Sequence, residues 1–303
     1  MNDLVLHFLK SSWSDVIIMQ HKDEICVIDT GFDGQYPQIA EYIKNLDCNK
    51  ISFVILTHFH NDHYGSLENL VKNFKIDKVY MKDYNALDYT NSDGEIATDE
   101  YRKKELSYFK TLKQLIEQRS KLINLEIVSS ISWGELSINV HNNKNLILRA
   151  YNDRVFPSFH TFKYNENVNS IALSLEYLGK TILLGGDILD KDDVIPYVNK
   201  INLRVAEQIN KEIDIYKVPH HGEDKSTSKE TLNVYKPKLN IITNSLKYVR
   251  NETSTLENIH KAYKDSSFLF TDKKNVIVSV NHPDGNIQVR QGNELKYDDI
   301  LKL

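Results

Sequence analysis

The sequence predicts an α/β protein in which two β-sheets face each other and helices cover their outer faces, a four-layer αββα sandwich. Each half of the 303-residue chain begins with short runs of apolar residues and continues into segments of helical periodicity. The run 51–56 is apolar almost throughout, as in a strand that is buried on both faces. No low-complexity linker separates the halves, so we expect a single domain over residues 1–303.

The elements of the first half follow from its apolar runs and polar turns. Strands are predicted at 4–9, 15–19, 24–29, 51–56 and 78–81. Helical spacing of apolar side chains predicts helices at 36–46 and 66–74, and Pro37 falls in a first turn, where proline is tolerated. A polar stretch predicts a long surface loop over 83–100, followed by a helix over 101–121. We expect this loop–helix segment, 83–121, to be the main insertion.

The second half repeats the pattern with more strands. Strands are predicted at 136–140, 146–150, 170–175, 180–184, 214–218, 239–243, 267–270, 276–280 and 287–290. Helices are predicted at 192–198, 203–211, 228–235 and 255–264. Leu178 and Gly179 stand between two of these strands and predict a hairpin.

Composition and charge exclude several protein classes. Hydrophobic residues make up 41% of the chain and charged residues 26%, which excludes disordered, collagen-like and coiled-coil proteins. The 38 basic and 42 acidic residues give a formal charge of −4, so no basic excess indicates a nucleic-acid or membrane surface. Cys26 and Cys48 are too few for a disulfide framework. We see neither a signal-peptide pattern nor an apolar span of membrane length, and expect a soluble cytoplasmic protein with no membrane partner.

One short motif concentrates ligand-type side chains. Directly after the strand predicted at 51–56, the chain places three imidazoles and a carboxylate within six residues: His58, His60, Asp62 and His63. Ligands usually bind where strands of an α/β sheet end. Imidazole nitrogens and carboxylate oxygens suit zinc, manganese or iron. A single ion cannot easily take all four side chains without strain, so the motif predicts two metal ions.

Three further predicted strands end in polar residues of the same kind. Asp187 follows Leu183-Leu184-Gly185-Gly186, and the pair His220-His221 follows the strand at 214–218. Asp29 ends the run 24–29, and we expect it to accept an imidazole N–H from a ligand and so fix its orientation. Together these strand ends predict one site.

At these residues the chain resembles the metallo-β-lactamase-fold hydrolase superfamily, over about residues 4 to 290. Three features resemble one branch of it, which holds the hydrolase domain of competence DNA-uptake proteins and the bacterial phosphorylcholine esterases. They are Asn169-Ser170, Gly185-Gly186-Asp187 and Val218-Pro219-His220-His221-Gly222. The segments 76–84 and 90–92 also resemble the phosphorylcholine esterases.

The resemblance implies the metallo-β-lactamase fold and a set of metal ligands. It implies His58 and His60 on the first metal, Asp62 and His63 on the second, Asp187 bridging, and His221 completing a shell. His220 then faces the substrate, although either member of the pair His220-His221 could be the ligand.

The chain departs from the superfamily at one position. Many members place another metal-binding histidine between the first motif and the bridging aspartate. Here that window offers only His141 and His160, neither in the family's usual context. Resemblance to the narrower branch implies that Asn169 and Ser170 occupy that region, close to the metal ligands. A first metal with fewer protein ligands would have more open positions, which favours phosphate oxygens over a compact acyl substrate.

These residues predict a binuclear hydrolase, most simply a phosphodiesterase that uses a hydroxide shared between its metals. Two divalent ions about 3.5–4 Å apart can share a hydroxide and hold both the attacking and the leaving oxygens. We predict Asp62 and His220 as catalytic residues, His220 by donating to a phosphoryl oxygen or protonating the leaving group. No G-x-S-x-G elbow or Walker loop offers another mechanism.

The substrate and the metal stay open at this point. The predicted partner is a small-molecule or nucleotide-type phosphodiester, including phosphorylcholine esters, with nucleic acid as an alternative and no protein partner indicated. A carbonyl substrate (a lactone, thioester or β-lactam) and a non-catalytic metal-binding module are the other function hypotheses. Two divalent ions are the expected cofactors, zinc first because the site is rich in nitrogen, with manganese as the alternative.

Overall fold

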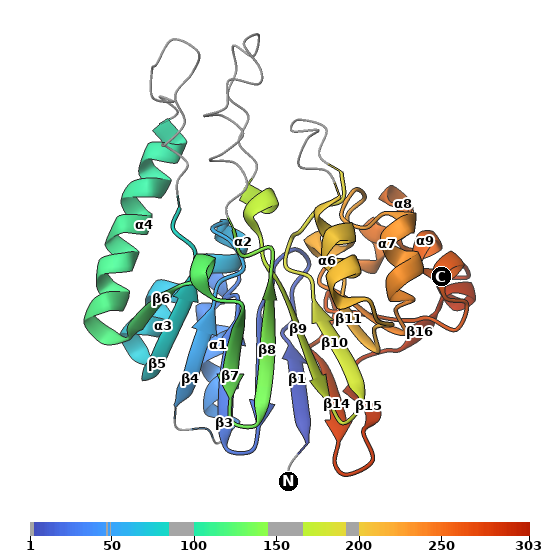
Figure 1. Cartoon of the computed structure of the whole chain (residues 1–303), viewed down its shortest axis with the longest axis horizontal. Helices are drawn as coiled ribbons and strands as arrows, with labels where there is room; N and C mark the ends of the chain where they lie inside the picture. Colours follow the sequence, from blue (N-terminus) through green and yellow to red (C-terminus); the bar gives the residue numbers. More distant parts are fainter. Residues whose placement is uncertain (1–2, 47, 49, 85–99, 145–165, 192–199) are drawn as a thin grey trace.

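Two β-sheets pack face to face with helices on both outer faces in the computed structural model (Figure 1). The structure describes residues 3–46, 48, 50–84, 100–144, 166–191 and 200–303. Within these residues each sheet has eight strands. The predicted αββα sandwich is therefore confirmed.

The first sheet joins the beginning of the chain to its end. Its strands, in spatial order, are β15 (Asn286–Gln291), β14 (Val276–Asn281), β1 (Leu4–Phe8), β2 (Ile17–His21), β3 (Glu24–Ile28), β4 (Ile51–Ile55), β5 (Ile76–Met81) and β6 (Lys121–Asn124). Strands β3 to β6 run parallel, whereas β15, β14, β1, β2 and β3 pair antiparallel. The parallel part orients β3 and β4 so that both end at the same edge.

The second sheet is built from strands between residues 130 and 296. In spatial order it holds β16 (Leu295–Lys296), β13 (Ser267–Phe270), β12 (Leu239–Ile242), β11 (Ile215–Lys217), β10 (Lys180–Leu184), β9 (Ala172–Tyr177), β8 (Leu136–His141) and β7 (Ser130–Trp133). Strands β9 and β10 form the predicted hairpin, and β10 to β13 run parallel. The ends of β10 and β11 therefore also share one edge.

Helices cover the outer face of each sheet (Figure 1). The first half of the chain contributes α1 (Tyr36–Lys44), α2 (Asn61–Tyr64), α3 (Leu67–Asn73) and α4 (Glu100–Arg119). The second half contributes α6 (Ile201–Ile209), α7 (Lys229–Tyr235), α8 (Leu246–Glu252), α9 (Thr255–Ala262) and α10 (Tyr297–Ile300). Short 3₁₀ helices are η1 (Asp33–Gln35), η2 (Leu125–Ile127), η3 (Glu166–Asn169) and η5 (His220–Gly222). None of the helices in the described ranges is long and apolar enough to span a membrane.

Alternating side chains of the strands build three apolar clusters. On β3, Cys26 and Ile28 join the cluster between the sheets, whereas Ile25 and Val27 join the cluster under α1, α3 and α4. A third cluster lies between the second sheet and its helices. Because β3 is buried on both faces, polar side chains are confined to its ends. Asp29 is the residue that directly follows the strand.

The structure differs from the sequence prediction in a few places. The helix predicted over 101–121 ends at Arg119, and β6 begins at Lys121 because it pairs with β5 in a parallel ladder. That pairing is a tertiary contact that local periodicity does not encode. The short elements β7, α8, α10 and β16 were not predicted. The predicted strand at 146–150, the predicted helix at 192–198 and most of the loop at 83–100 lie outside the described residues.

Candidate metal centre

The first ligand motif lies in the turn that follows β4. The turn carries His58 and His60, and the one-turn helix α2 carries Asp62 and His63. His58 and His63 are buried, at 3% and 0% exposure, whereas His60 and Asp62 are partly exposed. Burial of two imidazoles at a strand end is costly unless their ring nitrogens find partners. His63 finds one such partner in Asp29 after β3, and Asp187 after β10 lies near both imidazoles.

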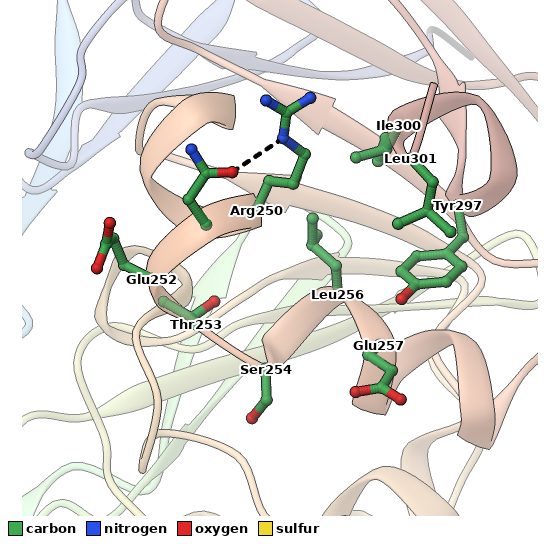
Figure 2. A pocket seen from close by; sticks show the side chains of 10 residues that line it. Arg250, Glu252, Thr253, Ser254, Leu256, Glu257, Tyr297, Ile300 and Leu301 are labelled. Carbon is green, nitrogen blue, oxygen red and sulfur yellow. Dashed lines mark hydrogen bonds between the residues drawn. The ribbon is translucent and has the colours of Figure 1, made fainter. Parts of the chain in front are cut away.

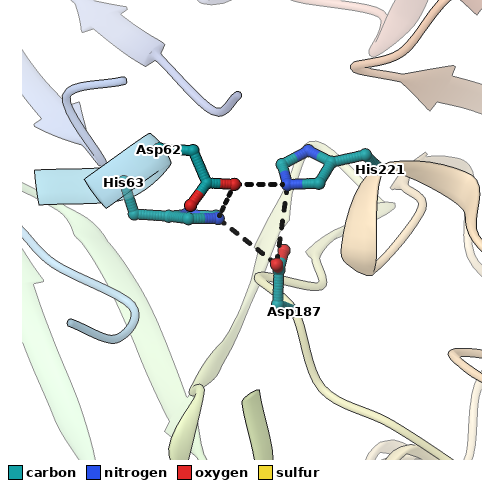
Figure 3. Close-up of side chains that lie close together, drawn as sticks. All are labelled: Asp62, His63, Asp187 and His221. Atoms are coloured by element: carbon teal, nitrogen blue, oxygen red, sulfur yellow. Dashed lines mark hydrogen bonds and ion pairs between the residues drawn. The ribbon is translucent and has the colours of Figure 1, made fainter. Parts of the chain in front are cut away.

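Four of the predicted ligands converge on one point (Figure 3). One nitrogen or oxygen from each of Asp62, His63, Asp187 and His221 lies within 4.8 Å of all the others. Oδ2 of Asp187 is 3.3 Å from Nε2 of His63 and 3.5 Å from Nε2 of His221. Oδ2 of Asp62 is 3.2 Å from Nε2 of His221. The first sheet thus supplies two of these side chains and the second sheet the other two.

A second pair of imidazoles, His58 and His60, lies next to this cluster. Nε2 of His58 is 2.9 Å from Nδ1 of His60 and 3.8 Å from Oδ2 of Asp187. The rings of His58 and His63 are 4.2 Å apart between centroids. Oδ2 of Asp187 therefore approaches His58 as well as His63 and His221.

The Asp29 carboxylate lies beside Nδ1 of His63. Its Oδ2 accepts a hydrogen bond from Nδ1 of His63 at 2.7 Å. Its two oxygens also accept the backbone N–H and the hydroxyl of Thr57, both at 2.8 Å. A carboxylate on Nδ1 fixes the proton there and leaves Nε2, with its lone pair, facing the cluster.

Asp15 and Thr243 lie behind His221, and sequence reasoning missed both. Nδ1 of His221 is 3.0 Å from Oγ1 of Thr243 and 3.2 Å from Oδ1 of Asp15, which accepts the hydroxyl of Thr243 at 2.6 Å. Lys217, the last residue of β11, is fully buried and pairs with the other oxygen of Asp15. A lysine inside an otherwise apolar predicted strand was the available signal, since such a buried charge requires a buried partner.

The turn that carries Asp187 is fixed by its backbone. Gly186 has a φ of +51°, in the left-handed region that favours glycine, and it lets the chain turn directly after β10. The backbone N–H of Asp187 donates to Oγ of Ser170 at 2.8 Å. Ser170, predicted close to the ligands, thus contacts the Asp187 backbone. Asn169, also predicted there, donates its side-chain amide to Glu166 at 3.2 Å.

Glu166 is a second buried group that sequence reasoning missed. Its Oε1 accepts the backbone N–H of Phe59, between His58 and His60, at 3.3 Å. Burial raises the pKa of Glu166 to about 7, and burial lowers the pKa of Lys82 to about 8. Lys82 donates to the backbone oxygen of Asn169 at 2.6 Å. Glu166 and Lys82 therefore hold the His58 turn and the η3 segment together.

The structure separates the two histidines of the pair after β11. His221 is fully buried and belongs to the cluster. The side chain of His220 is 22% exposed, its Nε2 lies 3.1 Å from the amide nitrogen of Asn167, and its Nδ1 lies 3.8 Å from Glu223. The geometry thus places His221 among the ligand-type groups and His220 beside them.

The buried imidazoles differ in the direction of their pKa shifts. Burial lowers the pKa of His60 to about 4 and lowers that of His58 well below its ordinary value, so both are neutral near pH 7. Burial opposes the charge on His221 as well, but Asp187 and Asp15 outweigh it and raise its pKa to about 10. A metal ion at Nε2 would take the place of the proton that these carboxylates favour.

Two other histidines were considered as ligands from the sequence. His141, at the end of β8, bonds to Oγ of Ser174 at 2.8 Å and lies 3.3 Å from the side-chain oxygen of Gln208. It therefore does not join the cluster. His160 lies outside the described residues.

A separate cavity of about 360 Å³ lies over helices α8, α9 and α10 (Figure 2). Its polar lining includes Arg250, Glu252 and Glu257, and Glu257 pairs with Lys261 on the next turn. Its lining residues include no histidine, so it lacks the mixed nitrogen and oxygen donors of the Asp187 cluster. The candidate metal centre is therefore the site at the strand ends.

A comparison with known protein families supports this assignment. The profile of the metallo-beta-lactamase superfamily matches residues 14–242, which include every residue of the cluster. The chain belongs to the metallo-β-lactamase superfamily. Members of this superfamily are generally hydrolases, and its fold implies divalent metal ions.

Individual relatives of this superfamily member are distant. An uncharacterized protein of Bacillus subtilis, YobT, is 30% identical over 66 residues, which span 22% of this chain and 28% of that protein's length. The metallo-beta-lactamase fold protein YhfI of Bacillus subtilis superposes with a TM-score of 0.50 at 10% identity, covering 91% of this chain and 99% of that one. A putative metallo-beta-lactamase of Thermotoga maritima gives a TM-score of 0.41 at 16% identity, covering 70% and 93%. At 10% identity the YhfI structure shows a shared fold alone.

The residues of the cluster fit the metal ions that the fold implies. Nε2 of His63 and Oδ1 of Asp187 are buried and have no hydrogen-bond partner among the described residues. Buried polar atoms without a partner are rare and indicate a missing ligand or ion. Two imidazole nitrogens and two carboxylates are a donor set that zinc or manganese accepts. The cluster could therefore hold a divalent ion, and the pair His58 and His60 could hold a second one with Asp187.

Proposed function

We propose that this protein is a binuclear metal-dependent phosphodiesterase. The position of Asp187 supports the proposal, because its Oδ2 lies within 3.8 Å of an imidazole nitrogen of each of His58, His63 and His221. A carboxylate that approaches imidazoles of both proposed ligand sets suits a bridge between two divalent ions, for which we propose zinc, with manganese as the alternative. Such ions supply Lewis acidity and lower the pKa of bound water toward about 7.

The proposed ligand sets follow the geometry. His58 and His60 would hold the first ion, because Nε2 of one and Nδ1 of the other lie 2.9 Å apart. Asp62, His63 and His221 would hold the second, because their side chains converge from two sheets. Asp29 would orient His63 through the hydrogen bond to its Nδ1. Asp187 would serve both ions.

The first ion would have an open coordination sphere. In the part of the chain that the structure describes, the third imidazole next to His58 and His60 is that of His63, which belongs to the second set, and His141 is engaged elsewhere. Open positions favour the several oxygens of a phosphodiester over a compact acyl group. We propose a nucleotide, nucleic-acid or phosphorylcholine-type diester, in line with the resemblance to the competence-protein and phosphorylcholine-esterase branch.

His220 is the proposed proton donor. Its side chain is 22% exposed, and its Nδ1, which is buried in this conformation, has no hydrogen-bond partner among the described residues. Asn167 fixes the ring through Nε2 at 3.1 Å. A ring held on one nitrogen can present the other to a phosphoryl oxygen or a leaving group.

Turnover by metal-reconstituted protein tests the proposal. The substrates are bis-p-nitrophenyl phosphate, p-nitrophenyl phosphorylcholine, a chromogenic β-lactam and a lactone. We expect diester cleavage that needs zinc or manganese and that an Asp187→Asn variant loses. The matched control is Asp214→Asn, because Asp214 precedes β11 at the end opposite to the centre and pairs with Lys238. Carbonyl hydrolysis without diester cleavage would overturn the phosphodiesterase, and two bound ions without any turnover would favour a metal-binding module.

A further inference from the structure

A buried ion pair lies behind the candidate metal centre. Lys217 is fully buried, and Asp15, with which it pairs, is 1% exposed. Nζ of Lys217 also donates to the backbone oxygen of Gly186 at 3.0 Å and lies 3.8 Å from Oδ1 of Asp187. A buried ion pair stabilises a protein little, since removing two charges from water costs about as much as their attraction returns. Its location next to Asp187 suggests a different role.

Asp15 connects the loops that carry the proposed ligands. Its side chain contacts His221, Thr243 and Lys217 from the second sheet. Its backbone N–H donates to the backbone oxygen of Asp62 at 3.3 Å, and its own backbone oxygen accepts the backbone N–H of Gly31 at 2.9 Å. One residue thus joins the His58 motif, the turn after β3 and the end of β11.

The two carboxylates behind the imidazoles have different partners. Apart from His63, Asp29 accepts hydrogen bonds from neutral donors, the N–H and hydroxyl of Thr57. Asp15 instead shares its charge with the ammonium of Lys217. Oδ1 of Asp15 serves His221 and Thr243, while Oδ2 faces Lys217. The orientation of the carboxylate toward His221 therefore depends on Lys217.

We propose that Lys217 and Asp15 are positioning residues for the metal centre: Lys217 orients Asp15, and Asp15 fixes His221 with Nδ1 as donor and Nε2 toward the ion. Lys217 in addition ties the Gly186 turn to this pair and thereby locates Asp187. The inference rests on metal binding by the proposed ligands and is independent of the substrate.

Removing the charge of Lys217 or of Asp15 alone should affect the metal centre differently from removing both charges. Lys217→Met leaves the Asp15 carboxylate buried without its cation and without the contact that holds Oδ2, so the carboxylate can rotate out of its present orientation toward His221. Asp15→Asn leaves an amide N–H₂ directed at the ammonium. In the double variant the amide oxygen can still accept from His221 and Thr243, and the N–H₂ faces an apolar side chain. A positioning role therefore predicts that the double variant recovers part of what each single variant loses.

The test is calorimetric titration of the metal-free full-length protein with Zn²⁺, together with the NMR signal of the His221 Nδ1 proton. We expect two sites in the wild type and, in each single variant, about 10- to 100-fold weaker binding at one of them, the usual effect of losing the partner behind a ligand. The His221 signal should disappear in the single variants and return in the double variant. The His63 signal should persist throughout, because its hydrogen-bond acceptor Asp29 is held by Thr57 and not by Lys217.

Two outcomes would overturn the inference. Equal Zn²⁺ affinities in folded wild type and single variants would show that the pair has no influence on the centre. A double variant as weak as the weaker single variant, while still folded by circular dichroism, would show a general structural role. A wild type that binds no zinc or manganese would instead refute the proposed function, which separates the two failures.

Discussion

Asp29 accepts a hydrogen bond from Nδ1 of His63 at 2.7 Å across 34 residues of chain. Both side chains are buried, and the carboxylate also accepts hydrogen bonds from the backbone N–H and the hydroxyl of Thr57. Desolvation raises the pKa of Asp29, although the attraction of His63 opposes that rise. This arrangement leaves the imidazole one free nitrogen, Nε2, and that nitrogen faces Asp187 and Asp62.

Replacement of Asp29 should weaken metal binding. In Asp29→Asn the carboxylate charge behind His63 is lost, and we expect one of two Zn²⁺ sites to bind about 10- to 100-fold more weakly. Calorimetric titration of the metal-free protein measures this. Asp33→Asn is the control, because Asp33 lies on the same loop and bonds Asn69 at the surface. Unchanged affinity in Asp29→Asn would contradict the proposed role.

Metal ions should stabilise the fold. An ion that binds only the folded state adds RT ln(1 + [L]/Kd), about 2.7 kcal/mol at a concentration 100 times Kd. We therefore expect a higher melting temperature with Zn²⁺ and a reversal by chelator, measured by differential scanning calorimetry. The increment should shrink in Asp187→Asn, because Asp187 contacts both sets of imidazoles. An equal increment in that variant would place the ions elsewhere.

Gly186 should tolerate alanine far less than another glycine with a similar backbone conformation. A Cβ at Gly186 would lie against the backbone oxygen of Ile171 and 2.6 Å from Oγ of Ser170, whereas a Cβ at Gly134 meets nothing within 4 Å. Both glycines have a positive φ, so both variants lose about 1–2 kcal/mol to backbone strain. We expect Gly186→Ala to lose about 1–3 kcal/mol more by overpacking, with reduced Zn²⁺ affinity. Chemical denaturation measures the difference, and equal losses would refute it.

Glu166 should make stability depend on pH between about 4.5 and 7. Its pKa is about 7 in the folded protein against an ordinary value of 4.5, so the folded state holds this proton more tightly. The contribution of this proton to the free energy of unfolding is complete below pH 4.5 and is lost as the pH rises through 7. We expect the wild type to lose on the order of 3 kcal/mol of unfolding free energy over this pH range, and Glu166→Gln not to lose it.

Denaturant unfolding at several pH values checks this prediction. Lys82 titrates above the same range, because burial lowers its pKa to about 8. Glu176→Gln on the surface, where Glu176 pairs with Lys211, is the control. Parallel stability profiles for the wild type and Glu166→Gln would show that Glu166 does not hold a proton near pH 7.

Local patterns predicted the elements that pack in regular ways. The strands β1, β3, β4 and β10 and the helix α1 follow their predicted ranges closely, because each carries an apolar run or stripe that the clusters bury. Elements that depend on a distant partner were missed. Strand β6 exists because Lys121 to Asn124 pair with Lys78 to Met81, and nothing in its four residues indicates this.

The sequence by itself determined which chemistry is available here. A motif of three histidines and an aspartate after one buried strand specifies nitrogen and oxygen donors, since ligand type is a property of the side chain and needs no tertiary information. The positions of Asp29, Asp187 and His221 after predicted strands could also be predicted, because each follows an apolar run in the sequence.

Only the tertiary structure decided how these donors meet. Asp62 and His221 are 159 residues apart in the chain, and they approach because parallel strands of two facing sheets end at one edge. The selection of His221 over His220 for the cluster, and the discovery of Asp15 and Lys217 behind it, also required three dimensions. A buried charge is stable only beside its partner, and that partner is set by packing between sheets, which spacing along the chain does not reveal.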